Sequence, residues 1–348
     1  MNHQETHDLK RKAQRQRTAR IVLAAVVFLV GALCVFSCFY PAETWKYYFS
    51  VPKIAERRAG ELRIHFLDVG QGDCSVIEFP DGRSMVIDGG NGSERLELVL
   101  MRYLQALKIK KPDFVLLTHT DSDHAGALDK LLKHKGAGVA YFPKIDDFSI
   151  NDEYAKFCAR LQKSSAEKRY SQAGETILSE DGRYPYRLLF LSPKTLDNPN
   201  CQYNAVNDGD YNETDINDTS AVVWLDYFGV STLFTGDAGA AVEQDLIRAA
   251  EIGALSFPKV PEFDLSSTEI LKVAHHGSKN STCAAFVDYL NVKTSVISCG
   301  KNNLYSHPHG ETVSTLERYG SEIYRTDLLG TVIITISANG TYEVSPSN

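Results

Sequence analysis

The sequence is poor in cysteine, and its cysteines form no recognisable pairs. Seven cysteines occur in 348 residues, and the five beyond residue 40 are Cys74, Cys158, Cys201, Cys283 and Cys299. Their number is odd and no two are spaced as Cys-x-x-Cys, which excludes a small domain held together by a disulfide framework. Buried free thiols are therefore expected, and a single incidental disulfide is the alternative.

Basic residues are scarce beyond the N-terminus. Residues 1–60 hold ten of the 37 Lys and Arg and four of the 44 Asp and Glu, so residues 61–348 carry a formal charge of −13. Non-specific nucleic-acid binding depends on cations that neutralise phosphates, and a domain this acidic lacks that pattern as a whole. The composition weakens a nuclease interpretation, although a local basic patch is compatible with an acidic whole.

Charged residues are absent from Ile21 to Tyr40, a stretch of twenty residues that is long enough to span a bilayer as a helix. Aromatic residues typical of a membrane interface follow this stretch: Trp45, Tyr47 and Tyr48. Basic residues precede it: Lys10, Arg11, Lys12, Arg15, Arg17 and Arg20. This bias predicts a single-pass protein of the cell membrane with a cytoplasmic N-terminus and an extracytoplasmic remainder. A cleaved signal peptide is the alternative, but it would have a shorter apolar core and a small-residue cleavage site, which does not follow Cys38.

These features divide the chain into four predicted parts. Residues 1–20 form a basic, disordered cytoplasmic tail, 21–40 a transmembrane anchor and 41–60 a linker. Residues 61–348 form one globular domain, and an apolar fraction of 43% over the whole chain is enough for an ample core.

Short strands alternate with helices throughout the predicted domain. Apolar periodicity predicts helices near 94–107, 127–134 and 240–251. Strands are predicted near 63–69, 74–79, 84–87, 114–117, 220–227, 230–235, 269–273, 294–297 and 331–336. Residues 143–215 are less regular, and we expect a partly helical insertion there, with a strand pair near 175–191. The mixture indicates an α/β (α+β) fold in which two sheets pack face to face with helices outside them.

Four metal-ligand side chains follow the apolar strand 114–117 within six residues: His119, Asp121, Asp123 and His124. A strand end holds its loop rigidly, so these side chains can converge at the edge of the sheet. Imidazole and carboxylate are the ligands of hydrolytic divalent-metal centres, in which a bound water ionises near neutral pH. The alternative is an acidic turn with two incidental histidines.

Further ligand types close other predicted strands. Asp237 ends the segment Thr235-Gly236-Asp237, where glycine permits a tight turn, and His275 and His276 follow the strand near 269–273. We predict that His119 and Asp121 bind one metal and that Asp123, His124 and His276 bind another. Asp237 would bridge them, because a carboxylate has two oxygens to share between two cations.

The segments HxDxDH, TGD and HHGS resemble those of the metallo-β-lactamase superfamily. Within it, Phe66–Asp73 (FLDVGQGD) is similar to the signature of the soluble hydrolase domain of ComEC-type DNA-uptake proteins, and further segments fit the same family: 86–90, 217–225, 271–278, 307–309 and 324–327. The likeness spans about residues 62–337. It implies a four-layer αββα sandwich with the metal site at one edge of the two sheets.

Two departures from the family pattern matter. Asp121 stands where many relatives have histidine, and no histidine occurs between His134 and His275. Oxygen-rich ligation favours manganese or magnesium over zinc, so we predict one or two divalent ions, zinc or manganese. The chain also has one predicted transmembrane helix where ComEC-type channels have many, so a role in DNA uptake would require a separate channel or surface partner.

Other polar residues near these segments have predicted supporting roles. Neighbours on a strand point to opposite sides, so only His276 is expected to face the metal. His275 then contacts phosphate, serves as a general acid or simply packs. Ser278, with Lys279, suits anion contact at a helix start, although a plain cap is equally consistent. The resemblance implies substrate contacts for His307 and His309. Asp68, Gln71 and Asp73 are expected to shape their loop, and Asp88 to orient its loop in preference to binding metal. Asn217, Asp218 and Ser220 either form a hydrogen-bonding loop or fill the missing ligand position. His65 points outward and His134 caps a helix at the surface, neither with a role in the site.

The favoured hypothesis is a membrane-anchored metallohydrolase that cleaves a phosphodiester, with DNA as the first candidate substrate. A hydrolase of cell-wall phosphodiesters, similar to the secreted phosphorylcholine esterases of the same superfamily, is the second candidate. A non-catalytic module that binds or assembles at the cell surface is the rival from another class. The sequence does not indicate the oligomeric state.

Overall fold

The computed structural model describes residues 3–39, 51–180 and 182–347, and the chain divides into two compact units, 1–51 and 52–348. Among the residues that the structure describes, the first unit contains helix α1 (His3–Phe39), whose segment Lys10–Ser37 is long and apolar enough to cross a membrane. The helix also includes the basic residues before the apolar stretch, so the expectation of a disordered tail over residues 1–20 is wrong. This segment has no glycine or proline and is rich in Gln, Arg, Lys and Ala, and extending an existing helix through such residues costs little.

The second unit begins earlier than the predicted domain. Residues 40–50, which include the aromatic residues Trp45, Tyr47 and Tyr48, lie outside the described residues. From Pro52 onward the chain belongs to the second unit. The Arg63 guanidinium donates to the carbonyl of Ala55 (2.6 Å), and the Tyr227 hydroxyl donates to that of Gly60 (2.7 Å). The second half of the predicted linker is therefore part of the domain.

Two mixed sheets form the centre of this unit within the described residues. The eight-stranded sheet has the order β15-β14-β1-β2-β3-β4-β5-β6. Its strands are β1 (Glu61–Phe66), β2 (Ser75–Glu78), β3 (Ser84–Ile87), β4 (Phe114–Leu116), β5 (Val139–Phe142), β6 (Glu167–Tyr170), β14 (Val332–Ser337) and β15 (Tyr342–Pro346). The seven-stranded sheet has the order β13-β12-β11-β10-β9-β8-β7. Its strands are β7 (Thr176–Leu178), β8 (Tyr186–Ser192), β9 (Val222–Tyr227), β10 (Val230–Phe234), β11 (Thr268–Lys272), β12 (Thr294–Ile297) and β13 (Glu322–Arg325).

Each sheet contains a run of parallel strands that determines where a site can form. Strands β3 to β6 are mutually parallel in the first sheet, and β10 to β13 are mutually parallel in the second. Parallel neighbours bring their carboxyl ends to the same edge of a sheet, where loops can combine their side chains. The predicted ligands follow β4, β10 and β11, so they lie at this edge.

The main core lies between the two sheets. Stacked rings join the sheets directly: Phe66 of β1 lies 5.9 Å from Phe234 of β10, and Phe79 lies 4.3 Å from Tyr186 of β8. A second apolar cluster covers the outer face of the seven-stranded sheet, where α9 (Ala240–Glu251), α10 (Ala284–Leu290) and α11 (Gly310–Arg318) pack. Both clusters consist largely of branched aliphatic and aromatic side chains, the residue types that favour buried strands.

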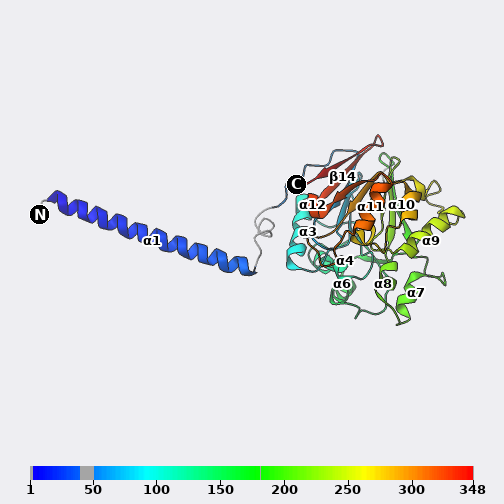
Figure 1. Ribbon diagram of the computed structural model, residues 1–348, viewed down its shortest axis with the longest axis horizontal. Coiled ribbons are helices and arrows are strands. Elements are labelled where there is room, and N and C mark those ends of the chain that lie inside the picture. Colours follow the sequence, from blue (N-terminus) through cyan, green and yellow to red (C-terminus); the bar gives the residue numbers. More distant parts are fainter. Residues whose placement is uncertain (1–2, 40–50, 181, 348) are drawn as a thin grey trace. The chain divides into compact units, whose positions relative to one another are not determined.

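Helices cover both outer faces of the sandwich. In Figure 1, α3 (Glu94–Ala106), α4 (Ser122–Ala125) and α6 (Asp152–Lys163) lie along one side of the domain, and α9 to α11 lie along the other. The predicted helices correspond to α3, α5 and α9, and the predicted four-layer αββα arrangement is confirmed. The helices are α3 (Glu94–Ala106), α4 (Ser122–Ala125), α5 (Leu128–His134), α6 (Asp152–Lys163), α7 (Gln202–Asn207), α8 (Glu213–Asp218), α9 (Ala240–Glu251), α10 (Ala284–Leu290), α11 (Gly310–Arg318) and α12 (Thr326–Leu329), with short 3-10 turns η2 (Leu265–Ser267) and η3 (Ala274–Gly277).

His65 does not point to solvent as its strand alternation suggested. It is fully buried, and its ring nitrogens contact the Tyr103 hydroxyl of α3 and the carboxylate of Glu78, each at 2.9 Å. Because α3 covers the outer face of β1, both faces of this strand are buried. Alternation along one strand therefore could not separate core from solvent here.

A buried carboxyl group joins two of the outer helices and makes stability depend on pH. Glu243 of α9 accepts hydrogen bonds from the backbone N–H groups of Thr282 (2.5 Å) and Cys283 (2.9 Å), at the start of α10. Burial raises the pKa of Glu243 from 4.5 to about 7, and the two N–H donors only partly oppose this shift.

Glu243→Gln is therefore expected to change the pH profile of unfolding. Between about pH 4.5 and 7 the folded protein holds a proton that the unfolded chain has lost, so stability falls as pH rises through this window and levels off above it. The glutamine variant lacks this titration. The native protein should lose about 2 to 4 kcal/mol relative to the variant between pH 4.5 and pH 8. Urea unfolding of residues 52–348 measures this difference, and parallel pH profiles for the two proteins would contradict it.

Candidate metal centre

Three loops meet tightly at the edge where the parallel strands end. The backbone N–H of Asp73 donates to the carbonyl of Asp123 (3.1 Å), which links the loop after β1 to the short helix α4. Gly72 permits this approach, because it has a φ of +124° and a Cβ atom there would collide with the Asp123 carbonyl. In the second sheet, Gly236 has the positive φ (+51°) that the predicted turn requires, and it aims Asp237 toward the same region.

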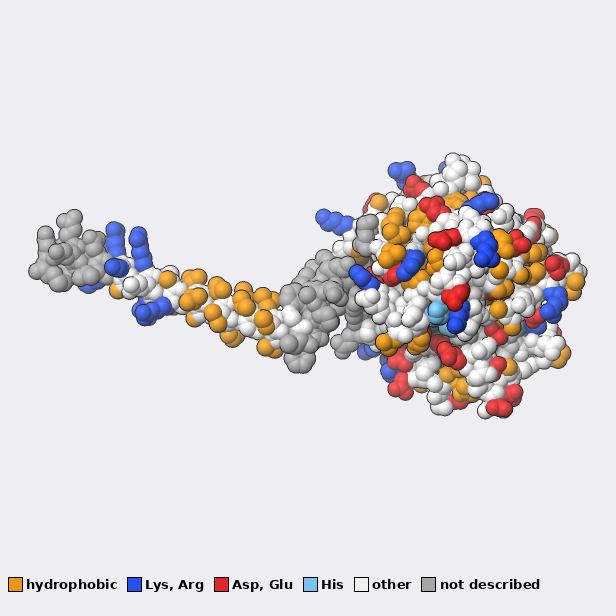
Figure 2. Space-filling view, viewed as in Figure 1, with side chains coloured by type: hydrophobic (Ala, Val, Ile, Leu, Met, Phe, Trp, Pro, Cys, Tyr) orange, Lys and Arg blue, Asp and Glu red, His pale blue; other side chains and the backbone are white. Residues whose placement is uncertain are grey.

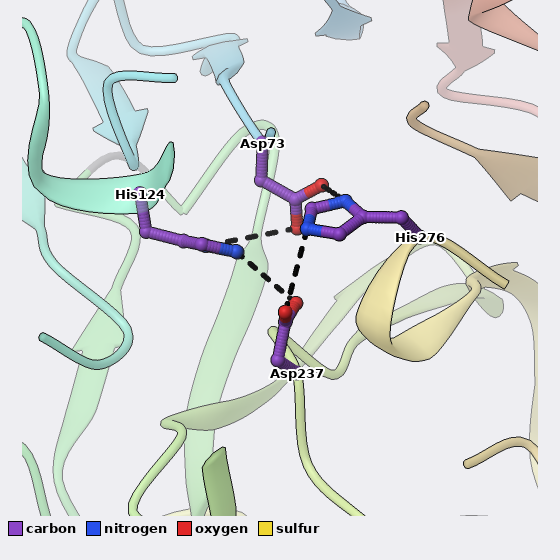
Figure 3. Close-up of side chains that lie close together, drawn as sticks. All are labelled: Asp73, His124, Asp237 and His276. Carbon is purple, nitrogen blue, oxygen red and sulfur yellow. Dashed lines mark ion pairs between the residues drawn. The ribbon is translucent and has the colours of Figure 1, made fainter. Parts of the chain in front are cut away.

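Two buried histidines are held so that one ring nitrogen faces the centre of the cluster. His124 Nδ1 donates to Asp88 Oδ2 (2.8 Å), and His276 Nδ1 donates to the carbonyl of Ser298 (2.9 Å). Their Nε2 atoms face Asp237, at 3.1 Å and 3.4 Å respectively (Figure 3). A bond at Nδ1 fixes the tautomer that leaves a lone pair on Nε2, as is usual for histidine ligands of metals. Asp88 also accepts from the backbone N–H and hydroxyl of Thr118, so it orients this loop as the sequence suggested.

The inward-facing atoms have no hydrogen-bond partner although they are buried. These atoms include His124 Nε2, His276 Nε2 and Asp237 Oδ1. Asp123 Oδ2 lies 3.2 Å from His276 Nε2 and adds a second carboxylate to the group. Buried polar atoms rarely lack partners. Imidazole nitrogens and carboxylate oxygens that converge in this way suit a divalent cation, which would satisfy all of them at once.

His119 and Asp121 lie next to this group. His119 is fully buried, its ring centroid is 4.2 Å from that of His124, and its Nε2 atom also lacks a hydrogen-bond partner. Asp121 Oδ2 lies 3.6 Å from His119 Nε2 and is partly exposed. The structure therefore brings the predicted ligands of the first loop to the same edge as Asp237 and His276.

Asp73 occupies the rear of the cluster and pairs with a buried lysine. It falls within the group of four mutually close ligand types, Asp73, His124, Asp237 and His276. Its oxygens, however, face Nδ1 of His276 (3.3 Å) and Nδ1 of His124 (4.0 Å), the sides turned away from Asp237. It also contacts the ammonium of Lys272, which is 3% exposed and donates to the carbonyl of Gly236 (3.3 Å). This placement fits the predicted supporting role of Asp73 better than a direct ligand role.

Lys272 is the residue that the sequence reasoning missed. It interrupts the apolar run Ile270–Ala274 directly before the histidine pair. A charged residue inside such a run was the available signal, because lysine is almost never fully buried without a partner.

The cluster attracts protons strongly when no cation balances its carboxylates. Burial disfavours the charged form of His124, but Asp237 and Asp88 raise its pKa well above the usual range. Burial likewise opposes the charge on His276, and Asp237 and Asp73 raise its pKa. Burial disfavours ionisation of Asp123, yet the neighbouring His276 holds its pKa below the usual range. The site is therefore built for positive charge, which a metal ion would supply.

The sequence matches the family model of the metallo-beta-lactamase superfamily over residues 67–301. The chain belongs to this superfamily. The match includes the first loop, Asp237 and the histidine pair of η3.

Two bacterial proteins are similar to this member of the superfamily. ComE operon protein 3 of Bacillus subtilis is 30% identical over 304 residues, which cover 83% of this chain and 35% of that protein. Recombination protein 2 of Haemophilus influenzae is 28% identical over 275 residues, which cover 78% of this chain and 28% of that protein. The chain thus spans about a third of the length of these relatives. The predicted resemblance to ComEC-type proteins is confirmed.

Among solved structures, a mutant of CmlA beta-hydroxylase aligns with a TM-score of 0.49 and 12% identity, over 81% of this chain and 55% of that one. This likeness is too weak to support an argument about function.

His275 lies close to Asp237, contrary to the strand geometry assumed for it. Both histidines of the pair have positive φ (49° and 55°) within η3, so they do not alternate as neighbours on a strand would. His275 Nε2 lies 3.8 Å from Asp237 Oδ2, and its side chain is 19% exposed. It is therefore at the margin of the cluster, reachable from solvent.

His307 and His309 extend the cluster outward. The His307 ring lies 5.4 Å from that of His275 and 4.9 Å from that of His309. Burial and the neighbouring histidines lower the pKa of His307 to about 4, so it is neutral near pH 7. Histidine side chains reach the surface on the face drawn in Figure 2, with basic and acidic side chains beside them.

Ser278 does not begin a helix. It follows η3, and the next helix, α10, starts at Ala284 with Cys283 as its cap. Its side chain is buried and accepts from the backbone N–H of Asn280 (3.3 Å). The anion contact proposed for Ser278 at a helix N-terminus therefore has no such helix to support it. The backbone N–H of the next residue, Lys279, donates to Nδ1 of His309 (3.1 Å).

The loop after α8 supports the turn that carries Asp237. Ser220 Oγ accepts from the backbone N–H of Asp237 (3.0 Å), and Asp218 Oδ1 accepts from that of Gly239 (3.1 Å). Asn217 is buried, and its Oδ1 atom has no hydrogen-bond partner. Through these two hydrogen bonds, Ser220 and Asp218 fix the turn that carries Asp237. His134 lies at the exposed end of α5, as predicted.

Proposed function

We propose that this protein is a membrane-anchored, extracytoplasmic metal-dependent phosphodiesterase, with DNA as the first candidate substrate. The convergence of buried imidazole and carboxylate atoms without hydrogen-bond partners carries this proposal. Membership of the metallo-beta-lactamase superfamily, whose members are typically hydrolases that use metal ions, supports it. The relatives favour DNA among phosphodiesters, because one of them is named a recombination protein.

The proposed ligands fall into two groups around a shared carboxylate. His119 and Asp121 would hold one ion, and Asp123, His124 and His276 would hold a second, with Asp237 between them. When bound by these residues, a divalent ion would supply a hydroxide nucleophile near neutral pH and would polarise the phosphoryl oxygens. The missing histidine and the presence of Asp121 make this set rich in oxygen, which favours manganese over zinc.

The protein side chains would orient the reactants and move the proton. Asp123 and Asp237 would accept hydrogen bonds from the attacking water and so position it. His275, at the solvent-facing margin 3.8 Å from Asp237, would donate a proton to the leaving oxygen as a general acid. His307 and His309 would contact the substrate, and His307 enters this role as a neutral imidazole because its pKa is lowered to about 4.

The anchor determines where the reaction would occur. Helix α1 includes one segment long and apolar enough to cross a membrane. The basic residues on its N-terminal side favour a cytoplasmic N-terminus, and the hydrolase domain would then lie outside the cytoplasm. A separate channel protein would be the partner if the substrate is DNA that enters the cell.

The proposal is tested by hydrolysis assays on the full-length protein in detergent. We expect turnover of bis(p-nitrophenyl) phosphate and of single-stranded DNA with manganese or zinc, loss of turnover with a chelator, and recovery when the metal is returned. Absence of turnover of every phosphodiester in the presence of metal would refute the class of reaction.

A second candidate substrate is a phosphodiester of the cell wall, such as a phosphorylcholine ester. The acidity of residues 61–348, with a formal charge of −13, favours a substrate less highly charged than DNA. Parallel assays with DNA and a phosphorylcholine ester distinguish the two candidates by their relative kcat/KM.

The rival from another class is a surface module that binds without catalysis. The near-complete set of inward-facing ligand atoms argues against it, because a redundant site has no physical reason to bury unpaired polar atoms. Asp123→Ala and His124→Ala should abolish function in cells if the protein is an enzyme. Function that survives both changes would support the binding module.

A further inference from the structure

We propose that Leu304 and Tyr305 form a stacking platform that holds an unpaired base beside the scissile phosphate. This inference rests on the proposed phosphodiesterase function and assigns a specificity-determining role to a loop outside the ligand set. The platform lies in the segment Gly300–His307, between β12 and α11.

The loop that carries the platform has a fixed shape. The Asn303 side chain donates from Nδ2 to the carbonyls of Gly300 (2.8 Å) and His307 (2.6 Å). Its Oδ1 atom accepts from the backbone N–H groups of Tyr305 (3.1 Å) and His307 (2.9 Å). One side chain therefore makes four bonds across the loop, and the two residues after it are presented in a single arrangement.

Both presented side chains are exposed and apolar in character. Leu304 is 99% exposed and Tyr305 is 61% exposed. A single exposed leucine needs no explanation. An exposed leucine next to an exposed aromatic ring, on a loop braced by four hydrogen bonds, forms a preorganised contact surface for a flat apolar group.

Ring contacts connect this surface to the metal centre. The Tyr305 ring stacks on His307, with centroids 5.6 Å apart and an interplanar angle of 22°. The His307 ring in turn lies 5.4 Å from His275 and 6.1 Å from His276. A phosphodiester held at the ligand cluster would thus have the platform as its neighbour on the side of His307.

The charges near the platform suit a polyanion. Lys301 and Lys279 are both exposed; Lys301 adjoins Gly300, and the backbone of Lys279 is bonded to His309. Aromatic rings flanked by cations are the usual arrangement for single-stranded nucleic acids, in which bases stack and phosphates pair with lysine or arginine. The same lysines would repel the quaternary ammonium of choline, which requires an aromatic cage for cation–π contact. Bases in a duplex are already stacked on their neighbours, so the platform selects unpaired strands.

The test compares a thymidine decamer with an abasic decamer of the same backbone, using full-length protein in detergent with manganese. Tyr305→Ala should raise KM for the thymidine decamer by about 5- to 150-fold, the range for loss of one base stack. The kcat should change little, and KM for the abasic decamer should not change. Tyr305→Phe retains the ring and should behave like the native protein. Phe228→Ala removes an exposed aromatic ring (40% exposed) from the turn between β9 and β10, at the opposite end of β10 from Asp237, and serves as the matched control.

A binding measurement separates this inference from the proposed function. Fluorescence anisotropy of the labelled decamers with Asp237→Asn reports binding without turnover. The platform would be supported if Asp237→Asn binds the thymidine decamer more tightly than the abasic decamer and Asp237→Asn/Tyr305→Ala binds both equally. This result would hold even if the native protein hydrolyses no phosphodiester and the proposed function fails. The platform would be overturned if the native protein had the same KM and the same affinity for both decamers. It would also be overturned if Tyr305→Ala changed the KM for both decamers equally. Neither result would contradict phosphodiester hydrolysis.

Discussion

Asp237→Asn is expected to reduce phosphodiester hydrolysis by at least about a thousand-fold, to the limit of detection. Asp237 is the one carboxylate whose oxygens face three histidines of the described site, at 3.1 Å from His124 Nε2, 3.4 Å from His276 Nε2 and 3.8 Å from His275 Nε2. Asparagine keeps its shape and removes its charge. An amide cannot bridge two cations as a carboxylate does, so the proposed ion pair would lose its shared ligand.

The matched control for this change is Asp226→Asn. Asp226 is also buried, but it lies on β9 and pairs with Arg187 (2.8 Å) away from the ligand cluster. This variant should keep its activity. The kcat of both purified variants with bis(p-nitrophenyl) phosphate provides the comparison. An Asp237→Asn protein that folds and retains a tenth of native activity would contradict the bridging role.

Lys272→Met is expected to destabilise the metal-free domain by about 3 to 5 kcal/mol, the usual result of removing one partner of a buried ion pair. The substitution would leave the Asp73 carboxylate buried without its cation, behind His276 and His124. Total stabilities of natural domains are about 5 to 15 kcal/mol, so this loss would be a large share. Urea unfolding of residues 52–348 in the presence of a chelator measures it.

The double variant Asp73→Asn/Lys272→Met shows why Lys272→Met loses stability. The cause is either the unpaired charge of Asp73 or the lost contacts of the Lys272 side chain. If the uncompensated Asp73 carboxylate causes the loss, removing its charge should restore much of the stability. Lys108→Met breaks an exposed pair with Glu56 and should leave stability unchanged. A single Lys272→Met variant as stable as the native domain would show that the ammonium does not compensate Asp73.

Local signals in the sequence predicted much of the fold. The strand at 294–297 and the helix at 240–251 match β12 and α9 residue for residue, because branched apolar runs and helical spacing are strong in these segments. The position of the ligands also followed from the chain, since each proposed ligand lies just after a strand and parallel strands end at a common edge.

The errors have identifiable physical causes. His65 was misplaced because α3 covers the second face of its strand, a tertiary fact that alternation does not contain. His275 was assigned from strand geometry, whereas η3 turns the chain through left-handed conformations. The pairing of Lys272 with Asp73 joins segments from different sheets, and no local pattern encodes such a contact. Residues 3–20 are helical because they continue an apolar helix, although their charge suggested disorder.

The metal content of the purified full-length protein shows whether the cluster at the sheet edge is a metal centre. The protein would be stripped with a chelator, reloaded with manganese or zinc, passed through a desalting column and analysed for bound metal per chain. The account predicts one or two divalent ions in the native protein and a clear loss of ions in Asp237→Asn and His276→Ala. A native protein that retains no more metal than these variants would show that the cluster at the sheet edge is not a metal centre.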